Sequence, residues 1–290
     1  MDIFISGPPR LLSLAVDVAR LFAWLLLLAV IFVPLERLFA VHPRSFLRKG
    51  IRTDLGYYFL SGLLTNVALV LPMAVIAAGL HRIVPVAVRT AAADLPLWAH
   101  LLAALAVGEV GFYWGHRWSH TIPWLWRFHA VHHSAQEIDW LVNTRAHPVD
   151  MVFTRLCGFV LLYVCGLAST TASAHGLTPV FVLVIGAMWG FFVHANVKWR
   201  FGWLEWVVAT PAFHHWHHTN DQHRDRNYAA MLPCLDRLFG TFHLPRHAMP
   251  PSYGIDAPVP SGLGRQLVWP LMPINRSLVE PSPLSPATVP

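Results

Sequence analysis

Two histidine clusters constrain this chain more strongly than any other feature of its sequence. The first runs from His116 to His133, and the second lies within residues 211–219. The first cluster begins with H-x-x-x-H, and both clusters contain H-x-x-H-H. Because residues three and four positions apart share one face of a helix, each cluster can direct its imidazole rings toward one point. The histidines in these patterns are His116, His120, His129, His132, His133, His214, His217 and His218.

Converging imidazoles predict a metal site, because neutral imidazole is a ligand for Fe, Zn, Cu and Ni. One ion cannot use all eight clustered histidines, so we expect two metals in a site that both clusters build. Two isolated histidines, His147 and His194, are expected at the membrane edge beside the clusters.

The composition is typical of a membrane protein. Apolar residues make up 55% of the 290 residues and charged residues only 12%, against about 25% in soluble domains. The net charge of +6 comes from basic residues in short loops beside apolar runs. Orientation in a membrane explains this placement better than binding to nucleic acid, so no nucleic-acid partner is expected. The three cysteines form no C-x-x-C motif and no disulfide framework.

Five apolar runs predict helices that cross or enter the membrane. We expect the first to end at Pro34 and Glu36, and Pro72 to kink the second. The last two should form a hairpin, and His116 and His120 should lie just beyond the end of the third. The runs cover residues 11–33, 55–80, 95–114, 151–168 and 177–193.

Basic residues follow the first apolar run and recur after residue 198, which assigns these segments to the cytoplasm. The same orientation brings every histidine cluster to the cytoplasmic side. We therefore predict an all-α, multi-pass integral membrane helical bundle. It has four to five transmembrane or re-entrant helices and a cytoplasmic helical cap that carries a histidine-rich di-metal site.

Three regions are expected along the chain. Residues 1–94 hold the N-terminal transmembrane helices and a basic cytoplasmic loop, and residues 95–247 hold the domain with the histidine motifs. Residues 248–290 form a proline-rich tail whose end is expected to be disordered.

Two features near the clusters have alternative interpretations that the sequence leaves open. Glu109 lies seven positions before His116, so its carboxylate could orient a ligand imidazole or pair with Arg155. Aromatic residues between the histidines could form an interfacial belt or line a channel for a substrate. These aromatic residues are Trp118, Trp124, Trp126 and Phe128.

Oxidation fits the clusters better than hydrolysis does. A hydrolytic zinc site usually includes a carboxylate base, and the motif H-E-x-x-H does not occur in the sequence. Iron can activate oxygen, and an apolar pocket would exclude water and accept a hydrocarbon chain. This combination favours oxidation of a C–H bond in a lipid. The alternative is a histidine-rich membrane metal transporter or metal-binding protein, although transport sites lie near the bilayer midplane and these clusters lie past helix ends.

Seven short motifs between residues 95 and 242 resemble those of the fatty acid hydroxylase/sterol desaturase superfamily of integral membrane di-iron oxygenases. They read HRWSH, HAVHH, RAHP, HAN, TPAFHHWHH, NYA and LDRLFGT. The resemblance implies two non-haem Fe ions, O2 as co-substrate, and hydroxylation or desaturation of a lipid that is fatty acyl, sterol or isoprenoid. It also implies a separate electron donor, either a cytochrome b5-like protein or a ferredoxin with its reductase, since no H-P-G-G haem motif occurs in the sequence.

When the motif positions are matched one by one, the resemblance adds the two isolated histidines, His147 and His194, to the ligand set. His215 matches no ligand position and is left out. Asn227 and Asp236 match positions that hold the cap around the site. The resulting set of metal ligands is His116, His120, His129, His132, His133, His147, His194, His214, His217 and His218.

Overall fold

The computed structural model describes residues 10–43, 45, 47–168 and 177–273, and within them it is helical without any strand. The long helices are α1 (Arg10–Phe39), α2 (Ile51–Ile83), α4 (Leu97–Thr121), α6 (Pro148–Val164) and α7 (Thr178–His194). The short elements are α3 (Val86–Ala93), α5 (Pro123–His133), η1 (Trp140–Thr144), η2 (Gly202–Trp206), α8 (Pro211–His217), α9 (Cys234–Leu238), α10 (Leu263–Val268) and η3 (Trp269–Leu271). The prediction of an all-α fold is therefore confirmed for the described residues.

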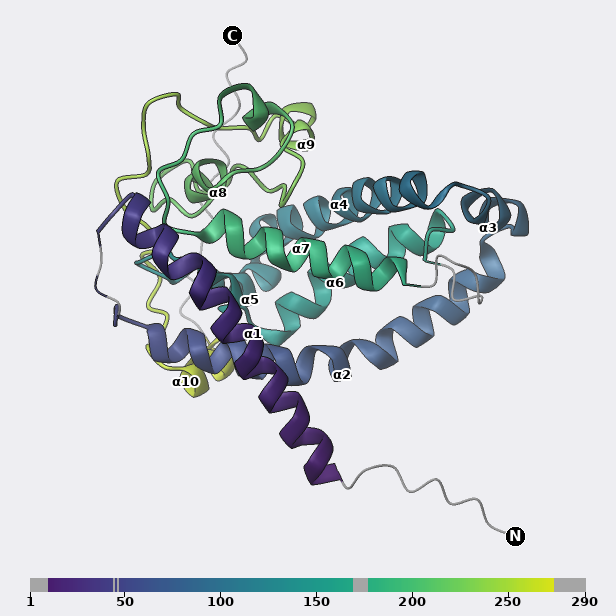
Figure 1. Ribbon diagram of the computed structural model, residues 1–290, viewed down its shortest axis with the longest axis horizontal. Coiled ribbons are helices and arrows are strands. Elements are labelled where there is room, and N and C mark those ends of the chain that lie inside the picture. Colours follow the sequence, from purple (N-terminus) through teal and green to yellow (C-terminus); the bar gives the residue numbers. More distant parts are fainter. Residues whose placement is uncertain (1–9, 44, 46, 169–176, 274–290) are drawn as a thin grey trace.

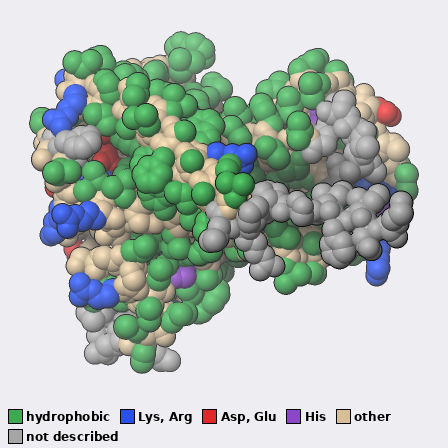
Figure 2. Space-filling view, turned by 60° about the horizontal axis from the view of Figure 1, so that its bottom comes forward, with side chains coloured by type: hydrophobic (Ala, Val, Ile, Leu, Met, Phe, Trp, Pro, Cys, Tyr) green, Lys and Arg blue, Asp and Glu red, His purple; other side chains and the backbone are tan. Residues whose placement is uncertain are grey.

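The long helices form a bundle, and most short elements gather at one end of it (Figure 1). Helices α2, α4, α6 and α7 run along the long axis of the molecule, and α1 crosses α2. Helix α3 joins α2 to α4 at one end, while α8 and α9 lie at the other. We call residues 199–247, which include α8 and α9, the cap. Hydrophobic side chains cover most of the face in Figure 2, and Lys and Arg lie mainly toward its two ends.

Within the described residues, two helices are long and apolar enough to cross a membrane, over Leu12–Phe39 and Leu97–Thr121. Helix α2 supplies a third if its halves, Ile51–Leu64 and Val67–Ile83, count as one broken span. Helices α6 and α7 have 17 residues each, and residues 169–176 of the expected hairpin lie outside the described part. The chain thus has the apolar helices of a membrane protein, and the number of four to five spans stays a prediction.

The two prolines expected to end or bend the first helices do neither. Helix α1 continues through Pro34 to Phe39. A proline removes one helical hydrogen bond, and membrane helices tolerate that loss. The halves of α2 meet at 43° between Leu64 and Val67, ahead of Pro72.

Helix α4 is longer than expected, and this changes the position of the first ligands. It continues to Thr121, so His116 and His120 lie in its last two turns rather than beyond its end. Proline disfavours a helical conformation in the residue before it, and Ile122 is extended ahead of Pro123 (φ −96°, ψ 114°). The chain therefore turns at Ile122 and starts α5.

Two acidic side chains tie the N-terminal helices to the segments around the site. The Glu36 carboxylate accepts hydrogen bonds from the backbone N–H groups of Trp140 (2.8 Å) and Asn196 (2.9 Å). Buried Asp54 on α2 forms ion pairs with Arg48 (2.7 Å) and Arg145. These contacts fix α1 and α2 against η1 and against the segment that follows α7.

Asn227 and Asp236 hold the cap together, as expected for their motif positions. The Asn227 side chain donates to the carbonyls of Phe213 (2.8 Å) and His243 (2.6 Å). Its positive φ of 58° is a conformation that asparagine tolerates. The Asp236 carboxylate accepts from the backbone N–H groups of Tyr228 (2.7 Å) and Ala229 (2.9 Å).

The expected C-terminal tail is ordered over the part that the structure describes. Trp269 is buried and packs in one cluster with Tyr57 of α2 and Trp126 of α5. The end of the tail, expected to be disordered, lies within residues 274–290, outside the described residues.

Candidate metal centre

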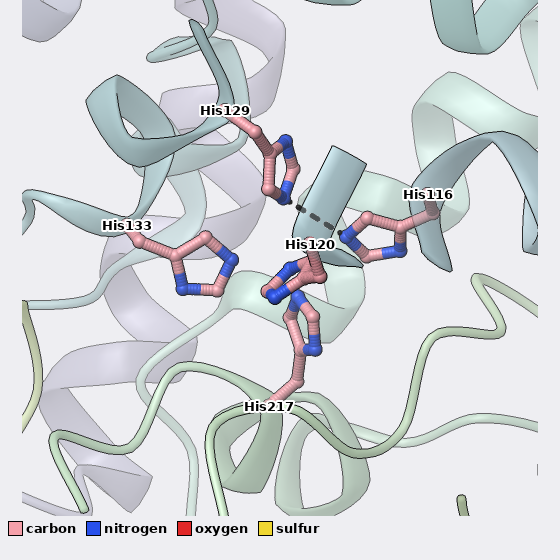
Figure 3. Close-up of side chains that lie close together, drawn as sticks. All are labelled: His116, His120, His129, His133 and His217. Atoms are coloured by element: carbon pink, nitrogen blue, oxygen red, sulfur yellow. Dashed lines mark hydrogen bonds between the residues drawn. The ribbon is translucent and has the colours of Figure 1, made fainter. Parts of the chain in front are cut away.

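Five histidines from three helices form the first group. Helix α4 contributes His116 and His120, α5 contributes His129 and His133, and α8 contributes His217. One nitrogen of each ring lies within 4.8 Å of the corresponding nitrogens of the others, and all five side chains are buried. Figure 3 shows these rings turned toward a common centre, with His116 and His129 joined by a 3.1 Å contact between their Nε2 atoms.

Four further histidines form the second group beside the first. His132 comes from α5, His194 from the end of α7, and His214 from α8, while His218 follows α8 directly. The Nε2 atom of His194 lies 3.0 Å from that of His214 and 3.2 Å from those of His132 and His218. The two groups adjoin, since the rings of His133 and His218 stack with centroids 4.5 Å apart.

Each H-x-x-H-H motif is divided between the two groups. In the motif of the first cluster, His129 and His133 belong to the first group and His132 belongs to the second. In the motif of the second cluster the assignment is reversed, because His214 and His218 join the second group and His217 joins the first. The expectation that each cluster points at one spot is therefore wrong. The sites are built jointly.

Hydrogen bonds on the outer side of the rings leave the inner nitrogens free to bind a cation. Four rings place Nδ1 against a backbone carbonyl, which can only accept, so Nδ1 carries the proton and Nε2 presents a lone pair. These contacts join His116 to Tyr228 (2.7 Å), His132 to Arg145 (3.0 Å), His194 to Gly190 (2.7 Å) and His217 to Arg226 (2.7 Å).

Two carboxylates act on the first group in the same way. Asp225 accepts from Nδ1 of His120 at 3.0 Å, and Asp150 accepts from Nδ1 of His129 at 3.0 Å. The other oxygen of Asp150 accepts from the Ser119 hydroxyl at 3.2 Å. Carboxylates behind a ligand histidine fix its ring orientation and raise its basicity.

The inner nitrogens of the first group include buried atoms without partners. Among the described residues, Nε2 of His120, His133 and His217 forms no hydrogen bond. Such orphaned acceptors are costly in a buried site unless something binds them. The donor set is composed of neutral imidazoles with carboxylates behind them, which suits iron as well as other first-row metals.

Burial keeps these imidazoles in the neutral form that binds metal. Desolvation, reinforced by neighbouring imidazoles, holds the pKa of His132, His133 and His218 well below the usual value. Burial also lowers the pKa of His214 and His217. The rings therefore do not need to lose a proton near neutral pH before they coordinate a cation.

One cavity of 260 Å³ opens onto both groups. Histidines form part of its wall at one end, namely His116 and His129 of the first group and His132, His194 and His214 of the second. Away from them, helices α4, α6 and α7 supply mostly apolar side chains, including Leu105, Phe159, Leu162 and Val182. The cavity can hold a hydrocarbon chain with one part of it against the histidines.

Two predicted features lie elsewhere than expected. His147 belongs to neither group, because its Nδ1 accepts from the Val149 backbone N–H (3.2 Å) and its Nε2 contacts the Leu267 carbonyl (3.1 Å). Glu109 neither orients an imidazole nor pairs with Arg155 in the described structure. Its carboxylate accepts from the backbone N–H groups of Met231 (2.7 Å) and Leu232 (3.2 Å).

The aromatic residues among the histidines are not part of the cavity wall. Trp118 and Trp124 are 42% and 58% exposed, as an interfacial belt requires. Trp126 and Phe128 are buried, and they pack against His133 and His147. Of the two interpretations, the channel lining is not supported.

The structure brings together nine of the ten histidines proposed as ligands, and it adds residues that the sequence did not single out. Asp150 lies two positions after the RAHP motif, and a search for carboxylates near the motifs could have found it. Asp225 is 105 residues from its partner His120, so no local pattern indicates their contact.

Comparisons with known proteins agree with this site. Residues 101–241 match the family described as fatty acid hydroxylase. Ornithine lipid hydroxylase OlsE from Rhizobium tropici is 35% identical over 179 residues, which cover 60% of this chain and 51% of that protein. Alkylglycerol monooxygenase from Homo sapiens is 28% identical over 163 residues, which cover 56% of this chain and 34% of that protein.

A third relative is named as a decarbonylase and not as a hydroxylase or monooxygenase. Very-long-chain aldehyde decarbonylase GL1-5 from Oryza sativa subsp. indica is 30% identical over 158 residues, which cover 51% of this chain and 25% of that protein. The chain thus spans about half the length of these relatives or less. No solved structure matches. The resemblance inferred from the seven motifs is confirmed, since the segment that carries both histidine groups matches the fatty acid hydroxylase family.

Proposed function

We propose that this protein is a membrane-bound non-haem di-iron enzyme that uses O2 to hydroxylate a lipid. The observation that carries the proposal is the cavity that has histidines of both groups at one end and mostly apolar side chains elsewhere. A hydrocarbon chain in this cavity would place a C–H bond beside two metals, away from water. A transporter needs an opening on each side of the membrane, and this cavity adjoins buried groups instead.

The nine grouped histidines would hold the two iron ions, five in the first group and four in the second. Bound iron would supply oxygen activation, which no side chain of the protein can provide. The protein would hold the imidazoles in the neutral form, orient them through their Nδ1 contacts, and exclude water with apolar walls. His147 is not part of the proposed ligand set.

Hydroxylation rather than desaturation is the proposed outcome, because similar proteins are named ornithine lipid hydroxylase and alkylglycerol monooxygenase. These names also support a lipid substrate. The electrons are proposed to come from a separate protein, either a cytochrome b5-like protein or a ferredoxin with its reductase.

We further propose that α1, α2 and α4 span the membrane, that α6 and α7 enter it as a hairpin, and that the cap lies in the cytoplasm. The basic residues between α1 and α2 and those of the cap support this orientation. Domain limits at residues 94 and 247 remain part of the same proposal.

One ligand from each group tests the di-iron assignment. His132→Ala and His217→Ala should each lower iron per chain and abolish gain of one oxygen atom by membrane lipids, as measured by elemental analysis and lipid mass spectrometry. His247→Ala, at an exposed position in the cap, is the control and should leave both unchanged. Full activity in the two ligand variants would contradict the proposal. Metal-dependent flux into vesicles, without oxidised lipid, would favour the transporter.

A further inference from the structure

Arg155 is a charged side chain in the wall of the cavity, and it has no partner among the described residues. It lies on α6 and is partly buried. No hydrogen bond or ion pair joins its guanidinium to any described residue. Neighbouring positions on the same wall are apolar or small, such as Gly158 and Phe159.

The two carboxylates that share this cavity are both engaged elsewhere. Glu109 accepts from the backbone N–H groups of Met231 and Leu232. Asp150 accepts from His129 and from Ser119. Neither carboxylate therefore compensates the charge of Arg155.

A partly buried guanidinium beside apolar walls is unfavourable without a counter-charge, because the hydration that it loses is not replaced by hydrogen bonds. Guanidinium also matches the planar geometry of carboxylate and phosphate, to which it can donate two parallel hydrogen bonds. A hydrocarbon chain that carries such an anionic group would satisfy both the apolar wall and the charge.

The position of Arg155 relates this group to the histidines. It lies five residues after Asp150, which is about 7.5 Å along the axis of α6. Asp150 contacts His129 of the first group. A group bound at Arg155 would therefore be held at a fixed distance from the metal ligands, and the carbon placed beside them would be fixed too.

We propose that Arg155 binds an anionic oxygen group, carboxylate or phosphate, on the lipid substrate and thereby sets the position of its chain in the cavity. This inference rests on the proposed function, since it concerns the substrate of the same site.

Equilibrium binding to the purified full chain in detergent tests the proposal without turnover. The labelled probes are palmitate, hexadecyl phosphate and hexadecanol, which share one chain and differ in the head group. The wild-type protein should bind at least one of the two anions about tenfold more tightly than the alcohol. The preferred anion identifies the head group.

Three variants separate the charge from its geometry and from the overall charge of the protein. Arg155→Met should lose the preference for the anion while binding hexadecanol unchanged, and Arg155→Lys should retain part of it. Arg82→Met removes an exposed charge at the end of α2 and should behave as wild type. Unchanged binding of hexadecanol also shows that a variant is folded.

Two results would overturn the inference: wild-type protein that binds the alcohol as tightly as both anions, or a preference that persists in Arg155→Met. Comparing the binding of the anions and the alcohol to wild-type protein tests the inference even if Arg155→Met does not fold. Binding of these probes requires neither O2 nor an electron donor. Lipid oxidation without anion preference would reject the role of Arg155 alone, whereas anion preference without iron or oxidation would reject the proposed function alone.

Discussion

Replacing Gly111 by alanine should destabilise the protein, because α4 and α6 touch there backbone to backbone. A Cβ atom at Gly111 would lie 2.3 Å from the carbonyl oxygen of Cys157 and 2.7 Å from Cα of Gly158. Ordinary van der Waals contact begins at 3.4 Å. The two helices would have to separate by about 1 Å, the difference between these distances.

The expected loss of stability in Gly111→Ala depends on which atoms must move to make room for the new Cβ. Overpacking a well-packed core costs about 1–3 kcal/mol, and the upper end applies here because a helix backbone cannot rotate away as a side chain can. For a protein of this size, that corresponds to a fall in melting temperature of about 5–10 °C. Because α4 carries His116 and His120, while Asp150 on α6 contacts His129, iron per chain should fall as well.

Two other glycines of α4 provide a graded control. A Cβ at Gly115 would meet the Cys157 side chain at 2.9 Å, and a Cβ at Gly108 would meet the nearest atom, of Val182, at 3.4 Å. Thermal melting of the detergent-purified variants should therefore rank Gly111→Ala as the least stable, Gly115→Ala as intermediate and Gly108→Ala as close to wild type. Equal melting temperatures for the Gly111 and Gly108 variants would refute the close-contact explanation.

Three further predictions concern the outer contacts, the cavity and pH. Asp150→Ala should weaken iron binding about 10–100-fold in a chelator competition, and unchanged affinity would show that its carboxylate does not support His129. Gly186→Leu adds a side chain at a cavity-lining position where a Cβ meets no atom within 4 Å, so it should raise KM for long-chain lipids without lowering the melting temperature; an unchanged KM would contradict this. Burial and the stacked His223 lower the pKa of His243 to about 4 from an ordinary 6.5, so the unfolded chain takes up the proton first and stability should fall as pH drops from about 6.5 to about 4. Melting curves of His243→Gln should depend less on pH over that range than those of wild type, and an identical dependence would assign the effect to other groups.

The sequence predicted the ligands better than their distribution. Spacing alone singled out the eight clustered histidines because their repeated patterns are rare by chance. Spacing did not predict how these histidines divide between the two groups, since residues three positions apart and residues four positions apart are both assigned to one face of a helix. Successive helical residues differ by about 100° around the axis, so His132 and His133 point to different sides of α5. Two separate groups form because α8 adds His217 to one of them and His214 to the other.

Contacts between distant segments account for what the sequence could not indicate. Glu109 reaches Met231 across 122 positions, and no periodicity or motif relates the two. A pair with Arg155 was one of the two alternatives left open for Glu109, and an oriented imidazole was the other. The backbone N–H groups of the cap satisfy the glutamate instead, and the arginine is left facing the cavity.

Docking of the cap against the bundle depends only partly on metal binding. Helix α8 provides His217 to one group and His214 to the other, so each group closes only when the cap lies against the bundle. Metal binding must therefore favour the docked cap. Two contacts join the cap to α4 without metal, however: Glu109 to the backbone of Met231, and Tyr113 to Thr241 at 2.8 Å. The Asp236 contacts hold the cap itself together. Because these contacts position the ligands beforehand, less of the binding free energy is spent on ordering the site.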